Sequence, residues 1–293
     1  MGSVLIDTQL PQNAKIIPEL DGVPETLLWP LWHRAAEQRR ARKLLVDPLA
    51  AELVASIDYD FRGHFGRPNP AHVIRARHGD DLIARYLREL PAGETPIVVS
   101  LGDGLETQPW RIDEPAIQWF SVDVPEVVTL RKRMLPDHPR LTSVACSALD
   151  TAWTDAIPRG STPFFNAAGL LMYFTDEEAI GLLATIADQF PRAWIYFDTI
   201  PTAFSERTLE GFNVTRRYKA PPMPWGIELE DIAPLLASVP GVRAEQVWHY
   251  GEPYPSRARV YSLLCKIPAF RRLFGAGLVL ARGERKSARG YRG

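Results

Sequence analysis

The chain has 293 residues, of which 46% are hydrophobic, and its formal net charge at pH 7 is −1. This length and apolar content suffice for one large α/β domain. A dedicated nucleic-acid-binding protein carries a strongly basic surface, so the near-neutral charge argues against that class. No stretch reaches the roughly 18 apolar residues that a membrane span needs, and no secretory signal is evident, so we expect a cytoplasmic protein without a membrane partner.

The two cysteines, Cys146 and Cys265, lie in apolar runs and share no metal-ligand spacing. Such cysteines are typical of buried free thiols, and we expect no metal site. The last segment, 282–293, holds five basic residues against one glutamate. We expect this segment to be a flexible, solvated tail.

Residues 1–95 are expected to form a helical cover. Pro24 opens the first helical segment, and Pro30 interrupts its first turn, so the regular helix is expected to start near Leu31. A second helix is predicted over 48–57, with Pro48 in its first turn. A third is predicted over 71–90, where apolar residues recur at the spacing of one helical face.

From residue 96 the pattern changes to alternating strands and helices. Short apolar strands are predicted at 97–101, 117–123, 141–146, within 162–174 and at 193–200. Helices are predicted at 125–136, 177–190 and 229–239, an insertion loop near 204–227, and two late strands at 244–251 and 275–282. We therefore expect a single α/β domain with a Rossmann-like, mostly parallel seven-stranded sheet over 96–281 and a late antiparallel strand.

The stretch VVSLGDGLETQPW, residues 98–110, places Gly102 and Gly104 just after the first strand. Glycines there permit positive φ and let a ligand approach the backbone closely, although a plain tight turn is the alternative. The nicotinamide fingerprint G-x-G-x-x-G is incomplete, because Thr107 stands at the third glycine position. Asp103 also disfavours a phosphate, so a cationic, phosphate-free cofactor such as S-adenosylmethionine fits better.

Asp123 ends the second strand, 21 residues after Gly102. A carboxylate at this position accepts hydrogen bonds from both ribose hydroxyls in nicotinamide and adenosylmethionine enzymes alike. It supports an adenosyl ligand without choosing between the two. The alternative is an ordinary aspartate near a helix start at Pro125.

Three stretches together resemble the leucine carboxyl methyltransferase family, and more closely its bacterial branch, which includes polyketide-tailoring O-methyltransferases. They are VVSLGDGLETQPWR, WFSVDVPEVVTLRKRML and AAGLLMYFTDEEAIGLLATIADQFPRAWIYFD, and the likeness runs in order over roughly residues 20–281. The resemblance implies a class I methyltransferase fold. It also implies S-adenosylmethionine as methyl donor and S-adenosylhomocysteine as product.

The resemblance also implies roles for single residues. Arg77 matches the arginine that binds the cofactor carboxylate, and Arg75 is a less favoured candidate for the same role. The alternative interpretation of Arg77 is a solvated arginine on the helix surface. The remaining positions expected to contact the cofactor are Gly102, Asp103, Gly104, Asp123, Ser147, Ala148 and Ala168. Of these, Ser147 and Ala148 are expected near the adenine. Besides Ser147, where the family often has an aspartate that accepts from the adenine amino group, two positions depart from the family. Gln108 replaces an arginine, and Ala168 replaces an acid that faces the cofactor amino group, for which Asp103 or a backbone carbonyl would substitute.

Methyl transfer from a sulfonium is an in-line displacement, so catalysis is expected to rest on positioning. A carboxylate acceptor needs no base, whereas a hydroxyl does. Tyr173 matches the family tyrosine and is expected to line the transfer site, with core packing as the alternative. Candidate bases are His33, His72, His249 and Tyr254, and candidate walls of an apolar substrate pocket are Trp29, Trp32, Met223 and Trp225.

The sequence therefore predicts an adenosylmethionine-dependent O-methyltransferase acting on a carboxylate or hydroxyl of a small aromatic or polyketide-like molecule. Two alternatives remain: a nicotinamide-dependent oxidoreductase, and a catalytically silent relative that binds adenosylmethionine. The expected partner is a small-molecule acceptor, not a nucleic acid, and a homodimer is compatible with the sequence.

Overall fold

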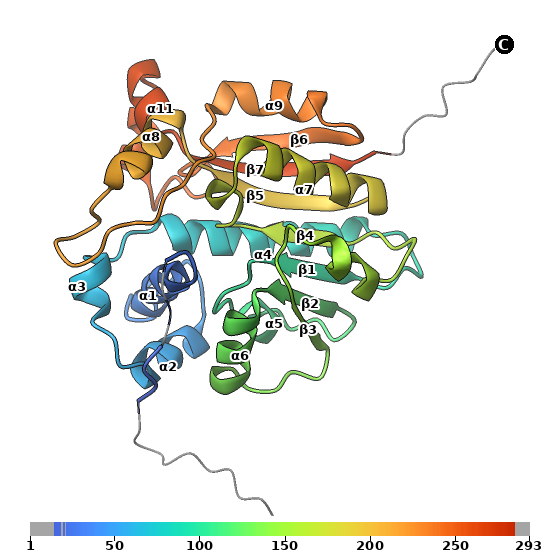
Figure 1. Cartoon of the computed structure of the whole chain (residues 1–293), viewed down its shortest axis with the longest axis horizontal. Helices are drawn as coiled ribbons and strands as arrows, with labels where there is room; N and C mark the ends of the chain where they lie inside the picture. Colours follow the sequence, from blue (N-terminus) through green and yellow to red (C-terminus); the bar gives the residue numbers. More distant parts are fainter. Residues whose placement is uncertain (1–14, 19, 21, 285–293) are drawn as a thin grey trace, which may run out of the picture.

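The computed structural model describes residues 15–18, 20 and 22–284, so most of the expected basic tail lies outside the described residues (Figure 1). Seven strands form one sheet in the order β3-β2-β1-β4-β5-β7-β6. Their bounds are β1 Ile97–Leu101, β2 Gln118–Asp123, β3 Leu141–Ala145, β4 Phe164–Ala167, β5 Trp194–Thr199, β6 Val242–His249 and β7 Gly277–Gly283.

The strands β1 to β5 pair in parallel, and β7 is antiparallel to both of its neighbours, β5 and β6. The expected α/β sheet with one late antiparallel strand is therefore confirmed. The chain runs outward from β1 to β3 and then returns to place β4 on the other side of β1. This return is the topological switch point, where open parallel sheets bind ligands beyond the carboxyl ends of their strands.

Helices cover both faces of the sheet. On one face α4 (Ala71–Glu89) packs Ile83 and Tyr86 against Val98 and Phe164 of β1 and β4. The other face is covered by α7 (Asp176–Gln189) and α9 (Leu229–Ser238). Thr175 begins α7 with a capping box that includes Glu178, as expected for a Thr-Asp helix start.

The N-terminal cover consists of a 3₁₀ turn η1 (Pro24–Leu27) and the helices α1 (Leu28–Glu37), α2 (Pro48–Ser56), α3 (Phe61–Phe65) and α4. The expected start of the regular helix near Leu31 is wrong, because α1 begins at Leu28. Pro30 lies in its first turn, where backbone N–H groups have no helical acceptor, so the missing N–H of proline costs nothing.

The short helices between the strands are α5 (Gln108–Arg111), α6 (Pro125–Met134), η2 (Thr151–Ala156) and η3 (Leu171–Tyr173). After β5 the structure holds more helix than the sequence predicts. The expected insertion loop begins with α8 (Thr202–Gly211), and the connection between β6 and β7 contains α10 (Arg259–Leu264) and α11 (Pro268–Phe274). The last strand β7 runs to Gly283, two residues into the segment expected to be a tail. No helix of the described residues is long and apolar enough to cross a membrane.

Candidate active site

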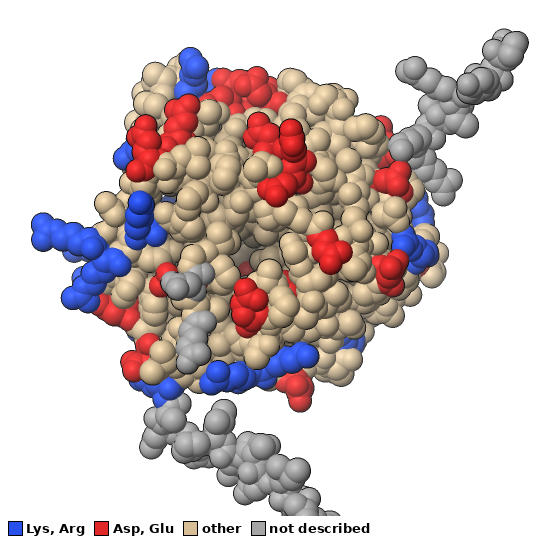
Figure 2. Space-filling model, in the orientation of Figure 1, with Lys and Arg blue, Asp and Glu red and all other residues tan. Residues whose placement is uncertain are grey.

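A cavity of about 1080 Å³ opens at the carboxyl ends of β1 and β4, at the switch point. The face drawn in Figure 2 is hollowed near its middle. The cavity walls come from η1, α1, α4, the loops after β1 to β5, and the connection between β6 and β7. Eight sequence-predicted site residues line the cavity: Gly102, Asp103, Gly104, Asp123, Ser147, Ala148, Ala168 and Tyr173.

The glycine loop is held tightly at both of its glycines. Gly102 and Gly104 have φ angles of 63° and 51°, in the left-handed region that favours glycine. A Cβ on Gly104 would lie 2.9 Å from the Cβ of Leu27 in η1, and one on Gly102 would lie 2.7 Å from the Leu170 side chain. The loop therefore passes between the N-terminal cover and the turn after β4 with no room for a side chain.

Asp103 is paired within the protein. Its carboxylate lies 2.8 Å from Nη2 of Arg131, and both side chains are buried. Burial raises the pKa of Asp103, and the Arg131 guanidinium opposes that effect. The same arginine donates a hydrogen bond to the carbonyl oxygen of Gly104 at 2.5 Å. Asp103 therefore helps to fix the shape of the loop while it lines the cavity.

Asp123 lies where a ribose-binding carboxylate is expected. Its Oδ2 accepts a hydrogen bond from the Gly104 backbone N–H at 2.7 Å, and its Oδ1 accepts one from Val124 at 2.8 Å. Burial raises the pKa of Asp123 to about 6, while these two backbone donors lower it. Each carboxylate oxygen keeps a further lone pair for a ligand hydroxyl in the cavity.

The structure places Arg77 outside the cavity. Its guanidinium lies 2.7 Å from Asp81 on the same helix, and its side chain is 43% exposed. Arg75, two residues earlier on α4, lines the cavity instead and is 12% exposed. The side chains at these positions point in different directions because successive residues of a helix are rotated by about 100°.

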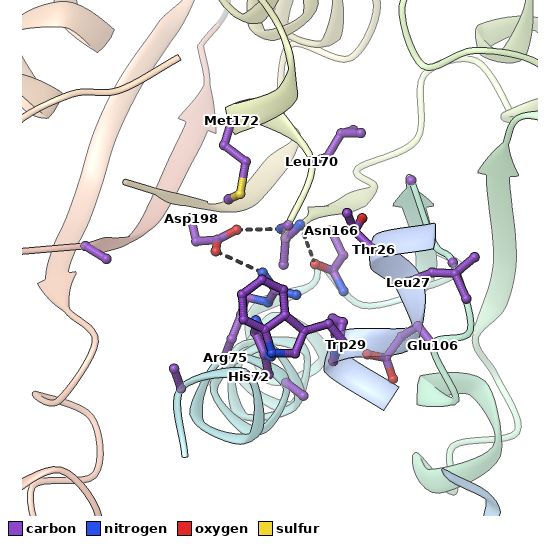
Figure 3. A pocket seen from close by; sticks show the side chains of 18 of the residues that line it. Thr26, Leu27, Trp29, His72, Arg75, Glu106, Asn166, Leu170, Met172 and Asp198 are labelled. Atoms are coloured by element: carbon purple, nitrogen blue, oxygen red, sulfur yellow. Dashed lines mark hydrogen bonds and ion pairs between the residues drawn. The ribbon is translucent and has the colours of Figure 1, made fainter. Parts of the chain in front are cut away.

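Sequence reasoning missed the carboxylate that holds Arg75. Asp198, at the end of β5, accepts a hydrogen bond from Nη1 of Arg75 at 3.0 Å and one from the Gly169 backbone N–H at 2.5 Å (Figure 3). It also accepts a hydrogen bond from the Tyr250 hydroxyl. The sequence carries a signal for it, because Asp198 follows the apolar run WIYF near the end of a strand, as Asp123 follows WFSV.

Gln108 and Ala168, which depart from the family pattern, belong to one chain of hydrogen bonds. The Ala168 backbone N–H donates to Oδ1 of Asn166 at 3.2 Å, and Asn166 donates to Oε1 of Gln108 at 3.1 Å. Gln108 in turn donates to Asp80 at 2.7 Å. Arg111 supplies a guanidinium to the same region, since its Nε lies 2.8 Å from Asp80.

Glu106 joins the glycine loop to the N-terminal cover. It forms ion pairs with Arg34 of α1, at 3.1 Å, and with Arg111 of α5. Burial raises the pKa of Glu106, but the two guanidiniums outweigh it and lower the pKa to about 2. Arg34 also lies 3.0 Å from Asp47, which caps α2.

Two histidines form a pair at the wall contributed by α1 and α4. Nδ1 of His33 and Nδ1 of His72 lie 2.8 Å apart, and Trp29 meets both rings edge-on. Burial, with a contribution from Arg75, lowers the pKa of His33 to about 4. Burial also lowers the pKa of His72 far below its usual value, so both imidazoles are neutral at pH 7. Only His72 of the pair lines the cavity.

The remaining predicted positions divide between the cavity and the core. Tyr173, in η3, lines the cavity, and burial raises its pKa. Trp29 and Met223 line it as expected, whereas Trp32 and Trp225 do not. The candidate bases His249 and Tyr254 also lie outside it, and Tyr254 donates its hydroxyl to Asp81.

A seven-stranded sheet with an antiparallel β7 between β5 and β6, and a glycine loop and acidic strand end at its switch point, defines a class I methyltransferase. The sequence model of the family described as leucine carboxyl methyltransferase matches residues 28–187, and the chain belongs to this family. It is an enzyme of the adenosylmethionine-dependent methyltransferase class, as the sequence predicted, and not a nicotinamide oxidoreductase.

Relatives and solved structures agree with this assignment. The chain is 30% identical over 232 residues to the tetracenomycin polyketide synthesis O-methyltransferase TcmP of Streptomyces glaucescens, covering 78% of this chain and 83% of the relative. It is 28% identical over 236 residues to a putative S-adenosyl-L-methionine-dependent methyltransferase of Saccharopolyspora erythraea, covering 74% and 79%. The CurJ carbon methyltransferase structure matches with a TM-score of 0.53 at 12% identity, covering 89% and 67%, and shows the fold.

Proposed function

We propose that the protein is an O-methyltransferase that places the methyl group of S-adenosylmethionine on a carboxylate of a small aromatic or polyketide-like molecule. The family description and the O-methyltransferase named among the relatives support oxygen as the acceptor atom. The cavity, at about 1080 Å³, is slightly larger than the roughly 300–1,000 Å³ typical of ligand pockets. That size suits a cofactor together with a second molecule.

The residues present fit the adenosyl cofactor. Asp123 offers lone pairs to the ribose hydroxyls, and Ser147 and Ala148 line the cavity beyond β3, where the adenine is expected. Arg75 has the donors for the carboxylate. Its Nη1 donates a hydrogen bond to Asp198. No described residue accepts a hydrogen bond from its Nε or Nη2, and neither of these atoms is among the buried polar atoms that lack a partner. These donors therefore face the cavity, and we assign Arg75 the role expected of Arg77.

The weak basicity of His72 supports the choice of a carboxylate acceptor. A hydroxyl acceptor must lose a proton to a base, and His72 is the one histidine of the described chain that lines the cavity. Burial and the positive charges of Arg75 and Arg34 oppose its protonation. A carboxylate is already ionised at neutral pH and needs no base.

The chain's own part in the reaction is to bind, orient and exclude water. The cofactor supplies an electrophilic methyl group when bound. Trp29, Tyr173 and Met223 offer apolar walls that hold an aromatic acceptor, and the N-terminal cover closes the cavity on one side. Holding the acceptor oxygen about 3–3.5 Å from the methyl carbon and in line with it accounts for most of the rate gain.

Calorimetry and a paired acceptor panel test the proposal. Titration with S-adenosylhomocysteine is expected to show binding that NADH does not, and Asp123→Ala is expected to lose it. Turnover is then measured on aromatic carboxylic acids and on phenols of the same ring skeleton. Methyl ester formation on the acids supports the proposal, ether formation on the phenols alone contradicts the carboxylate assignment, and binding without any turnover favours the silent relative.

A further inference from the structure

The connection between β6 and β7 is much longer than the fold requires. Two adjacent antiparallel strands can be joined by a hairpin of about two to five residues. Here residues 250–276 form the connection and contain α10 and α11. Neither helix has a fully buried residue, and Tyr261 of α10 packs against the core from a partly buried position.

The outward side of this connection is apolar. Five large hydrophobic side chains on α10, α11 and their flanks are between 46% and 72% exposed: Val260, Leu263, Ile267, Leu273 and Phe274. We call these residues, with the basic residues among them, the cap surface. Exposed apolar side chains gathered in this way mark an interaction site more often than scattered ones do.

The cap surface is also cationic. Residues 250–276 include five arginines and lysines and one acid, Glu252. Arg257 is paired with Glu37, and Arg271 lies 3.6 Å from Glu230. The other three, Arg259, Lys266 and Arg272, are exposed, and no carboxylate of the described residues pairs with them. Helix α8, which contacts α11, carries the exposed acids Glu206 and Glu210 (Figure 1).

The inner side of the same connection belongs to the cavity. Arg257 to Tyr261 line it, and so does Phe274, so Val260 and Phe274 of the cap surface are also cavity residues. The Tyr261 hydroxyl donates to the Phe274 carbonyl oxygen at 2.9 Å and ties α10 to the end of α11. Whatever contacts the cap surface therefore lies directly beside the cavity.

We propose that the cap surface docks on an anionic lipid surface and brings the cavity mouth to it. Protruding Leu, Ile, Val and Phe side chains interleaved with Lys and Arg suit the boundary between acyl chains and anionic headgroups. Leu263, Ile267 and Leu273 are exposed outside the cavity, and a lipid surface accommodates such side chains without shape matching. A twofold dimer through this surface would set the same unpaired cations against one another. This proposal differs from the sequence-based expectation of no membrane partner. It requires docking on the membrane surface only, and no helix that spans the bilayer.

Vesicle co-sedimentation of the full chain tests the docking, and its readout does not depend on methyl transfer. The protein is mixed with vesicles of phosphatidylcholine alone or with added phosphatidylglycerol. We expect binding to the anionic vesicles that weakens as salt screens the headgroups. The double variants Leu263→Ser/Ile267→Ser and Lys266→Gln/Arg272→Gln change residues outside the cavity, and each is expected to lower the partition coefficient by about tenfold or more.

The matched control is Val46→Ser/Arg39→Gln, which changes an exposed apolar and an exposed basic residue between α1 and α2. It is expected to bind vesicles as the wild type does. Titration with S-adenosylhomocysteine verifies that each variant is folded with an intact cofactor site. Equal wild-type binding to neutral and anionic vesicles overturns the proposal. So does a wild-type dimer that Leu263→Ser/Ile267→Ser converts to a monomer, because a second copy then covers the surface.

Discussion

Arg75 and Asp198 form a largely buried ion pair near the end of β5, with 3.0 Å between Nη1 and Oδ2, although they lie 123 positions apart in the chain. Arg75 belongs to the N-terminal cover and Asp198 to the end of β5. Asp198 also accepts hydrogen bonds from Gly169 and Tyr250, so one carboxylate orients an arginine, a turn and a tyrosine at the cavity wall. The site therefore forms only when the cover is docked on the sheet.

The substitution Asp198→Asn keeps the size of the side chain but removes the charge that holds Arg75. We expect the Kd for S-adenosylhomocysteine to rise by about tenfold, which corresponds to about 1.4 kcal/mol, because Arg75 is no longer fixed. Isothermal titration calorimetry measures it. Tyr250→Phe removes one of the three hydrogen bonds to Asp198 and is expected to have a smaller effect. Wild-type affinity in Asp198→Asn would show that Arg75 needs no support.

Arg75 and Arg77 offer a matched pair on one helix. Arg75→Gln is expected to raise the Kd for S-adenosylhomocysteine by about tenfold to a hundredfold, since a charge-assisted hydrogen bond to a carboxylate contributes about 1.5–3 kcal/mol. Arg77→Gln loses only an exposed pair with Asp81 and is expected to leave the Kd unchanged. The reverse order of the two variants would restore the role that the sequence assigned to Arg77.

The difference between these two arginines shows where sequence reasoning reaches its limit. The strands were predictable because their buried apolar runs are short and bounded by turns, and the glycine loop and Asp123 follow from their place at strand ends. Two arginines two residues apart on one helix carry no such signal, since their partners come from other parts of the chain. The pairing of Arg75 with Asp198 emerges only from the fold.

The short helices α10 and α11 escaped prediction for a related reason. A helix is recognised in a sequence by a buried apolar stripe, and neither of these buries a residue. At Pro30 the sequence predicted too little helix. A proline disrupts the interior of a helix but is well tolerated in the first turn, where Pro30 lies.

The substitution Gly104→Ala tests how tightly the glycine loop is held. A non-glycine residue at φ 51° costs about 1–2 kcal/mol, and the new Cβ would meet that of Leu27 at 2.9 Å. We expect the free energy of unfolding to fall by about 2 kcal/mol or more, together with weaker binding of S-adenosylhomocysteine. Gly181→Ala on α7, where a Cβ meets nothing within 4 Å, is expected to stabilise the protein by about 0.5–1 kcal/mol. Denaturant titration of both variants measures the difference.

The raised pKa of Asp123 predicts a pH dependence of cofactor binding. The group is ionised above its pKa of about 6 and accepts hydroxyl donors best in that form. Affinity for S-adenosylhomocysteine is therefore expected to be constant from pH 7 to 8 and to fall below about pH 6, with binding there releasing protons. Calorimetry in buffers of different ionisation enthalpy detects the released protons. Asp123→Asn is expected to bind weakly with no such pH dependence, and a wild-type affinity unchanged down to pH 5 would contradict the assignment.

The histidine pair yields the prediction that separates the two acceptor chemistries. With a carboxylate acceptor no proton is transferred to the protein, so His72→Gln is expected to keep kcat within about threefold and to act mainly on KM. The kcat of the wild type is then expected to be flat between pH 6.5 and 8.5, because the acceptor carboxylate is ionised throughout this range and no protein base takes part. A hydroxyl acceptor would require His72 as the base, and loss of His72 would lower kcat by about a hundredfold or more.

His33→Gln tests the role of His72 indirectly. It removes the ring bonded to Nδ1 of His72 and changes no residue that lines the cavity. A large loss of kcat in both variants would overturn the carboxylate assignment and leave the cofactor site unaffected.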